Sequence, residues 1–112
     1  MGLDFEGSKA CWSYSGFNRF RERLAFSIGI ELADLQGYGG KVKPSQVYDD
    51  IKWLLFHSDC DGKISARRCG LIAPRLRDIT LCWEACYDKE QAILLAEGME
   101  ACARNGRPLE FC

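Results

Sequence analysis

The twelve residues HSDCDGKISARR carry the side chains of this chain that are best suited to binding a cation. When His57 is counted as the first position of an EF-hand loop, Asp59 and Asp61 fall at the third and fifth positions, which are ligands in such a loop. Gly62 then falls at the sixth position, where the loop turns sharply, and Ile64 at the eighth. Imidazole nitrogen and carboxylate oxygen together suit divalent transition metals. The segment therefore predicts a metal site formed by His57, Asp59 and Asp61.

The same segment lacks the ligand that holds calcium most firmly in an EF-hand. Arg68 stands at the twelfth position, where a bidentate carboxylate is required. Calcium is therefore disfavoured, while another divalent metal stays open. The alternative is a helix-loop-helix corner without a cofactor, in which the aspartates bond the backbone and Arg67 or Arg68. We prefer this alternative, because a motif without a principal ligand is usually a chance match, and we expect Arg68 to bond Asp59 or Asp61 in place of an ion.

A second group of residues, CWSYSGFNRFRER, combines aromatic rings with arginines at the start of a predicted helix. Trp12 and Tyr14 supply flat apolar faces. Arg19, Arg21 and Arg23 supply guanidinium groups that match phosphate or carboxylate oxygens. Four of these residues are candidates for binding a phosphorylated small molecule: Trp12, Tyr14, Arg19 and Arg21. The plainer alternative is that the rings anchor the core and the arginines form the solvated face of the helix.

The sequence does not supply a complete set of residues for covalent catalysis. Seven cysteines are present, and their odd number, without a C-x-x-C pair or a secretion signal, predicts reduced thiols. His57 is the only histidine. Cys60 lies close to it, but no third residue is placed to orient the imidazole. The sequence leans toward a protein that is not an enzyme, without deciding the question.

Length and composition bound the class of protein. A chain of 112 residues, of which 47% are apolar, predicts a single globular domain over residues 1–112. Fifteen basic and sixteen acidic residues give a net charge of -1, which argues against binding nucleic acid through bulk charge. The sequence has no N-terminal signal pattern and no apolar run long enough for a bilayer. We therefore expect a cytoplasmic protein that does not contact a membrane.

Helices must position the candidate residues, because apolar side chains recur at helical spacing through most of the chain. The first two predicted helices run from an N-cap at Ser15 toward Gly29 and from Pro44 to about His57. A third starts from an N-cap at Ser65, and Pro74 interrupts it, so that it either kinks or restarts there. Helices are also predicted over 79–87 and from an N-cap at Asp88 to a stop at Asn105 and Gly106. The two ends, GLDFEG and PLEFC, alternate apolar and acidic residues as paired strands do. We therefore predict a mainly α fold, in which about four helices form a compact domain with an EF-hand-like helix-loop-helix and a two-stranded ribbon joins the termini.

Four segments together resemble a family of small uncharacterised proteins of bacteria and phages: MGLDF, WSYSGFNRFRERLA, HSDCDG and APRLRDI. The resemblance covers most of the chain. It implies no established activity, but it implies that the WSYSGF and HSDCDG segments act together. The chain departs from the family at Arg67 and Arg68, where acidic residues are common, and this departure argues further against a metal.

These observations lead to one functional hypothesis and two alternatives. The hypothesis is a small cytosolic binding module that is not an enzyme, a phage or bacterial accessory protein that captures a phosphorylated small molecule or a protein partner. The first alternative is a metal-dependent hydrolase that uses His57, Asp59 and Asp61. The second alternative is an interaction protein that acts as an oligomer.

Overall fold

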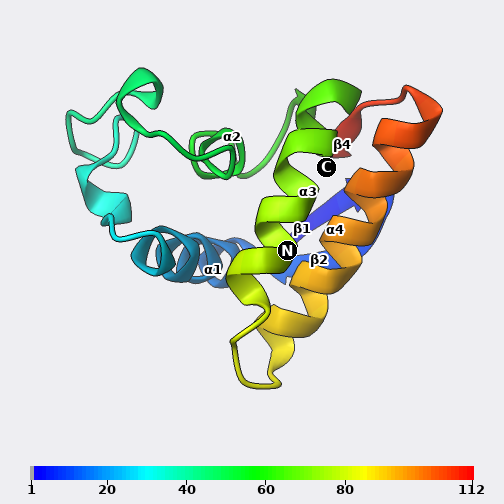
Figure 1. Ribbon diagram of the computed structural model, residues 1–112, viewed down its shortest axis with the longest axis horizontal. Coiled ribbons are helices and arrows are strands. Elements are labelled where there is room, and N and C mark those ends of the chain that lie inside the picture. The colour runs from blue at the N-terminus through cyan, green and yellow to red at the C-terminus, as the bar shows by residue number, and fades with distance from the viewer. Residues whose placement is uncertain (1) are drawn as a thin grey trace.

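A four-stranded antiparallel sheet joins the two ends of the chain (Figure 1). The computed structural model describes residues 2–112. The strands are β1 (Gly2–Glu6), β2 (Ser8–Ser13), β3 (Lys63–Ile64) and β4 (Leu109–Phe111), in the spatial order β2-β1-β4-β3. The helices are α1 (Tyr14–Ser27), α2 (Lys52–Leu55), α3 (Ala66–Thr80) and α4 (Tyr87–Asn105), with short 3-10 helices η1 (Leu32–Asp34) and η2 (Pro44–Gln46). The fold is therefore α+β, and the prediction of a mainly α fold with a two-stranded ribbon is wrong.

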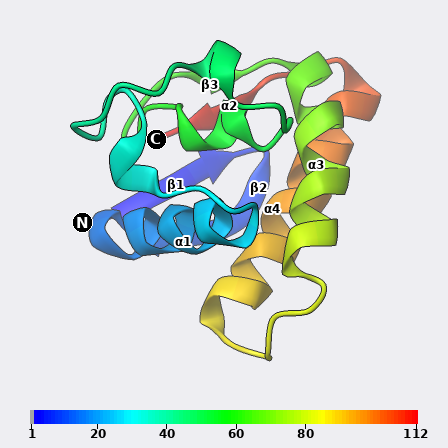
Figure 2. The same cartoon turned by 60° about the vertical axis from the view of Figure 1, so that its left-hand side comes forward.

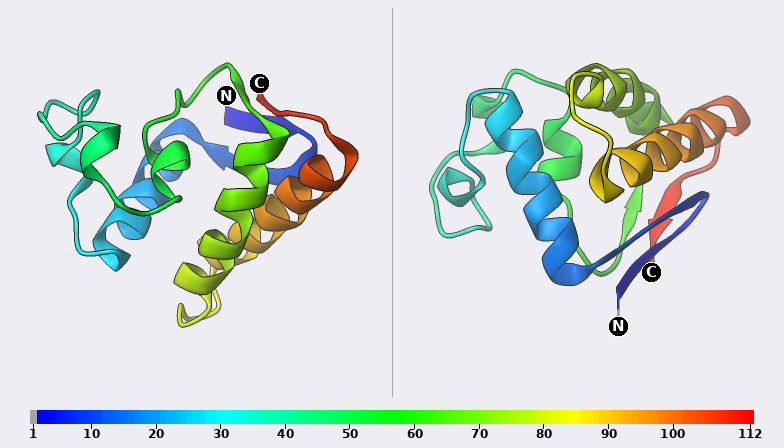
Figure 3. Two further views of the ribbon diagram at one scale, coloured as in Figure 1. Left: turned by 45° about the horizontal axis from the view of Figure 1, so that its top comes forward. Right: turned by 90° about the horizontal axis from the view of Figure 1, so that it is seen from below.

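The two ends of the chain do pair, but they form the middle of the sheet. Phe5 of β1 faces Phe111 of β4 in antiparallel register. The backbones of Asp4 and Cys112 also exchange two hydrogen bonds, of 3.2 and 2.9 Å. Both views of Figure 3 place the two termini near each other. The sheet is wider than predicted because β2 returns beside β1 through a hairpin and β3 adds to the other side of β4.

One face of the sheet is buried beneath the helices. The side chains that alternate onto this face are all at most 7% exposed: Leu3, Phe5, Ala10, Trp12, Leu109 and Phe111. The residues between them on β1 and β2 are exposed, among them Asp4, Glu6 and Lys9. This alternation is that of an antiparallel sheet with one face on the core and one in water.

Two glycines let α4 lie close against the β1–β2 hairpin. A Cβ on Gly98 of α4 would stand 2.4 Å from the Cβ of Ser8. A Cβ on Gly7, whose φ is +112°, would stand 2.9 Å from the Sγ of Cys102. In this close approach the Ser8 hydroxyl donates to the carbonyl of Leu94 at 2.8 Å. The hairpin and α4 are therefore fixed to each other by backbone proximity.

The apolar periodicity of α1 is confirmed, but its start differs from the prediction. Phe17, Phe20 and Leu24 are fully buried, as their spacing predicts. The N-cap is Ser13, whose Oγ accepts a hydrogen bond from the backbone N of Gly16 at 3.0 Å. The predicted N-cap, Ser15, is therefore wrong, and α1 follows β2 without a connecting loop.

Helix α3 begins where the sequence predicts. The Oγ of Ser65 accepts from the backbone N of Arg68 at 3.2 Å. Pro74 lies inside α3, which continues through it as one helix, so the predicted alternative of a restart at Pro74 is wrong. Proline has no N–H to bond the carbonyl of Gly70. Because Gly70 is exposed, water can bond that carbonyl instead.

The apolar segment ITLCWEACY is not a helix of its own. Helix α3 ends at Thr80, a loop follows, and α4 begins directly after its N-cap, Cys86. Asp88 lies in the first turn of α4 and is not the cap that the sequence predicted. Gly106 ends α4 with a φ of 66°, which confirms the predicted stop.

The predicted second helix is mostly replaced by turns. Only Pro44–Gln46 and Lys52–Leu55 are helical in this region. Between them the Oδ1 of Asp49 accepts from the backbone N of Ile51 at 3.0 Å, and Asp49 also binds Arg75 of α3 at 2.7 Å. This ion pair joins residues that are far apart in the sequence, which local periodicity does not register.

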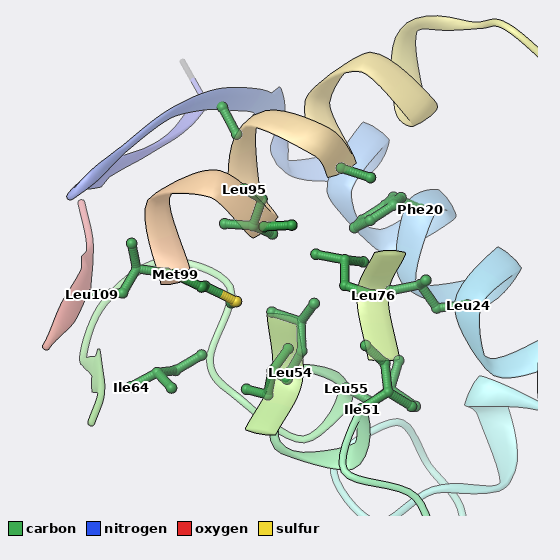
Figure 4. Close-up of a cluster of buried hydrophobic side chains, with 14 of the residues drawn as sticks. Phe20, Leu24, Ile51, Leu54, Leu55, Ile64, Leu76, Leu95, Met99 and Leu109 are labelled. Atoms are coloured by element: carbon green, nitrogen blue, oxygen red, sulfur yellow. The ribbon is translucent and has the colours of Figure 1, made fainter. Parts of the chain in front are cut away.

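The hydrophobic core lies between the sheet and the helices α1, α2, α3 and α4, and it includes Ile51, which precedes α2 (Figures 2 and 4). Figure 4 labels ten of its side chains, of which the fully buried ones are Phe20, Leu24, Ile51, Leu54, Leu55, Leu76, Leu95, Met99 and Leu109. Burying one side chain of this size contributes roughly 1.5 to 3 kcal/mol. Within residues 2–112, no helix combines the length and the apolar character needed to cross a membrane.

Candidate functional site

A pocket of about 320 Å³ opens where the N-terminus of α1 meets the N-terminus of α4. We call it the junction pocket. Its walls come from the end of β2, the first turns of α1 and the first turn of α4. The residues that line it are Trp12, Ser13, Gly16, Arg19, Arg23, Cys86, Tyr87 and Asp88.

Three hydrogen bonds hold the end of β2 on the first turns of α4. The indole Nε1 of Trp12 donates to the Oδ1 of Asp88 at 3.1 Å. The Tyr87 hydroxyl donates to the carbonyl of Cys11 at 2.6 Å, and the backbone N of Cys11 donates to the Oε1 of Gln91 at 3.0 Å. Because α1 follows β2 directly, these bonds also fix where α1 begins.

Two arginines reach the junction pocket in different states. Arg23 is held in place: its Nη1 lies 3.3 Å from the Oδ2 of Asp88 and 3.6 Å from the Sγ of Cys86, and its guanidinium stacks 4.0 Å from the ring centroid of Trp83. Arg19 is exposed, and within residues 2–112 its side chain has no hydrogen bond or ion pair. One arginine is thus preorganised, and the other is available to a ligand.

Cys86 marks a point of the junction pocket where negative charge is stabilised. A hydrogen bond from Arg23 lowers the pKa of the Cys86 thiol from its ordinary value, and the backbone N–H of Lys89 lowers it further. Cys86 is also the N-cap of α4, where the helix dipole favours an anion. By contrast, burial raises the pKa of Cys69 to about 11. The groups that stabilise a thiolate here would stabilise another anion in the same way.

A wider groove of about 680 Å³ lies on the other side of Arg23, which lines both hollows. We call it the α1 groove. One wall is the outer face of α1, and the others are the residues after α1 and the loop before α4. Its polar and aromatic lining includes Asn18, Glu22, Phe26, Glu31, Tyr38 and Trp83. Phe26 is 78% exposed, so its ring is open to solvent in the groove.

The structure brings two of the four predicted ligand-binding residues together. Trp12 and Arg19 both line the junction pocket. Tyr14 is half-buried and packs against the core. Arg21 lines neither hollow and is only 2% exposed. Arg21 therefore belongs neither to the junction pocket nor to the solvated face of α1, and the binding roles of Trp12 and Arg19 stay predictions.

Arg21 ties α1 to the end of α2. Its Nη1 donates to the carbonyl of His57 at 2.6 Å and approaches those of Leu54 and Leu55 at 3.5 and 3.4 Å. The hydroxyl of Tyr38 donates to the carbonyl of Leu55 at 2.5 Å. Burial lowers the pKa of Arg21. Its guanidinium donates to backbone carbonyls at the C-terminal end of α2, which have no partner within the helix.

The predicted metal ligands do not converge on a common point. The Nδ1 of His57 lies 2.9 Å from the carbonyl oxygen of Ser58 and its Nε2 lies 3.1 Å from that of Lys63, so both ring nitrogens face acceptors within the chain. The ring also packs 4.1 Å from the ring centroid of Phe111. The Oδ1 of Asp61 accepts from the Ser58 hydroxyl at 3.0 Å. Among residues 2–112, no three histidine, cysteine or acidic side chains are grouped as a metal site.

Arg68 does not take the place of an ion in this loop. Its guanidinium stacks 3.9 Å from the ring centroid of Trp53, which precedes the loop. It forms no ion pair with Asp59 or Asp61 among the residues that the structure describes, so that expectation is wrong. The loop closes instead through β3, where Ile64 pairs with Leu109. The Arg68 guanidinium therefore lies against an aromatic ring and not against the aspartates.

The residues that sequence reasoning missed lie on α4 and in the loop before it. Asp88 meets Trp12 across 76 positions of the sequence, and Cys86 meets Arg23 across 63 positions. Trp83 meets Arg23 in the same way. Nothing local marks these partners, because only the packing of α4 against β2 brings them to α1.

Comparison with known proteins adds no relative: no family model, no curated protein and no solved structure matches this chain. The resemblance to small bacterial and phage proteins therefore stays a prediction, and the site has to be interpreted from its own geometry.

Proposed function

We propose that this protein binds a small phosphorylated molecule in the junction pocket. The observation that carries the proposal is the convergence of two helix N-termini and two arginines on one hollow. The positive ends of both helix dipoles attract an anion here, while the backbone N–H of Gly16 is already capped by the Ser13 hydroxyl. Arginine adds paired donors whose geometry matches phosphate oxygens.

The charges of the junction pocket favour a single anionic group. Arg19 and Arg23 face one carboxylate, that of Asp88, which is already bonded by Trp12 and Arg23. The pocket therefore keeps one unpaired positive side chain beside the two dipoles. A charge-assisted hydrogen bond from Arg19 to a phosphate oxygen contributes about 1.5 to 3 kcal/mol, and each helix dipole about 0.3 to 1 kcal/mol.

The size of the junction pocket suits a phosphate group with a small substituent. Ligand pockets usually enclose about 300 to 1,000 Å³, and the junction pocket, at about 320 Å³, is at the small end.

Binding without catalysis is the simplest function that these groups support. The alternative of a metal-dependent hydrolase gains no support from the loop, because both nitrogens of His57 face backbone carbonyls.

Calorimetric titration with inorganic phosphate, pyrophosphate and ribose 5-phosphate tests the proposal. We expect saturable binding that weakens as salt is added, because the attraction is electrostatic. Arg19→Gln should weaken it about 10- to 100-fold, which corresponds to the loss of one charge-assisted bond. Arg107→Gln is the matched control, since Arg107 is an exposed arginine outside the pocket. Absence of binding at millimolar ligand, or equal affinity of the two variants, would refute the proposal.

A further inference from the structure

The junction pocket and the α1 groove are neighbouring hollows separated by one side chain. Arg23 lines both of them. Toward the junction pocket its guanidinium bonds Asp88 and Cys86, and it stacks on Trp83, which lines the groove. A ligand that places a phosphate in the junction pocket therefore has the groove open to the rest of its structure.

The α1 groove offers the largely exposed ring of Phe26 beside the half-buried ring of Trp83. Phe26 is 78% exposed although it lies on the helix that carries much of the core. Trp83 is half-buried, with Arg23 on its face and the ring of Phe20 6.0 Å away at its edge. Tyr38 closes the groove at its far wall. An exposed aromatic ring beside a half-buried one offers a flat surface on which a nucleobase can stack.

The polar groups of the groove are acidic, in contrast to those of the junction pocket. Glu22 and Glu31 both line it and both are exposed. One oxygen of Glu22 accepts from the Nδ2 of Asn18 at 3.1 Å, and Glu31 has no side-chain partner among the residues that the structure describes. These carboxylates disfavour a second phosphate in the groove and favour a group that carries N–H donors.

We propose that the two hollows form one site for a nucleotide, with the phosphate in the junction pocket and an amino-bearing base in the α1 groove. This inference rests on the proposed function, because the phosphate fixes the end of the ligand. The positive pocket and the acidic, aromatic groove complement the two ends of such a molecule. The base would lie against Phe26 and Trp83 and donate its amino hydrogens to Glu22 or Glu31, while the sugar would cross the side chain of Arg23.

Calorimetry with adenosine, guanosine and uridine monophosphates, compared with ribose 5-phosphate, tests the inference. We expect the amino-bearing nucleotides to bind at least tenfold more tightly than ribose 5-phosphate, and more tightly than uridine monophosphate. Phe26→Ala should reduce this advantage severalfold and leave the affinity for ribose 5-phosphate unchanged. Tyr48→Ala is the matched control, because Tyr48 is 96% exposed and does not line the groove. Arg19→Gln should weaken all the ligands together.

The outcomes separate this inference from the proposed function. If ribose 5-phosphate binds as tightly as every nucleotide, the base site is wrong and the phosphate site stands. If nucleotides bind more tightly but Phe26→Ala and Tyr48→Ala behave alike, the base lies outside the α1 groove and the inference is overturned. If no phosphorylated ligand binds, both the proposed function and the inference fail.

Discussion

Replacing Arg21 by methionine tests whether a buried guanidinium fixes the end of α2. Methionine keeps a flexible side chain of comparable length but removes the donor that lies 2.6 Å from the carbonyl of His57. That short charge-assisted bond is worth about 1.5 to 3 kcal/mol. The approaches to the carbonyls of Leu54 and Leu55, at 3.5 and 3.4 Å, are long and add little.

The burial of Arg21 sets the size of the expected effect. Arg21 is 2% exposed, and its Nε has no hydrogen-bond partner among residues 2–112, so folding already bears part of the cost of removing this charge from water. Methionine relieves that cost, which offsets part of the lost bond. We therefore expect Arg21→Met to lower the free energy of unfolding by about 2 kcal/mol.

Chemical denaturation followed by circular dichroism measures this loss directly. The midpoint should fall while the slope with denaturant stays unchanged, because the surface exposed on unfolding is almost the same. The control is Arg107→Met, at an exposed site, which should change stability by less than about 0.5 kcal/mol. Equal stability of the two variants would show that the contact between Arg21 and His57 does not hold α2, and the reasoning would then be wrong.

Three further predictions concern thiol reactivity, pH and metals. Cys86 should react with iodoacetamide at neutral pH before Cys69, because its thiol pKa is lowered while burial raises that of Cys69 to about 11; peptide mass spectrometry reads the order, and faster labelling of Cys69 would contradict it. The hydrogen bond from Arg75 holds the pKa of Asp49 below its ordinary value, so the ion pair stabilises the fold above pH about 4, and this contribution is lost as the pH falls below that value. Asp49→Asn should therefore reduce the fall of the melting temperature with decreasing pH below about 4. An unchanged pH dependence of the melting temperature would contradict this. Calcium and a chelator should leave the melting temperature unchanged, because Arg68 stands where the loop would need a bidentate carboxylate and residues 2–112 hold no cluster of side chains suited to a metal; a reproducible rise with calcium would contradict this.

Local signals in the sequence predict helix ends that depend on a single capping residue. Ser65 caps α3 and Gly106 ends α4 as predicted, because an N-cap hydroxyl and a left-handed glycine act within a few positions of the chain. Ser13 and Ser15 both precede the apolar stripe of α1, and the pattern alone favoured the wrong one. The helical stretch after Pro44 was overpredicted for another reason, since an ion pair with α3 holds its middle in a turn.

The sheet and the junction pocket depend on contacts between residues far apart in the sequence, which local sequence patterns do not predict. The alternating ends of the chain correctly indicate that the termini pair, but neither Ser8–Ser13 nor the two-residue β3 was predicted as a strand. Trp12 and Arg19 were identified because they belong to one local motif. Cys86 and Asp88 were not identified as parts of the site, because their partners lie 63 and 76 positions away.

The location of bound phosphate tests the central claim most directly. Titration of isotope-labelled protein with inorganic phosphate, followed by two-dimensional amide NMR, reports which backbone N–H groups the anion approaches. We predict saturable shifts at the start of α1, around Gly16, and in the first turn of α4, around Asp88, with residues 57–68 unaffected. Saturable shifts confined to residues 57–68, or none at either helix N-terminus, would contradict the account.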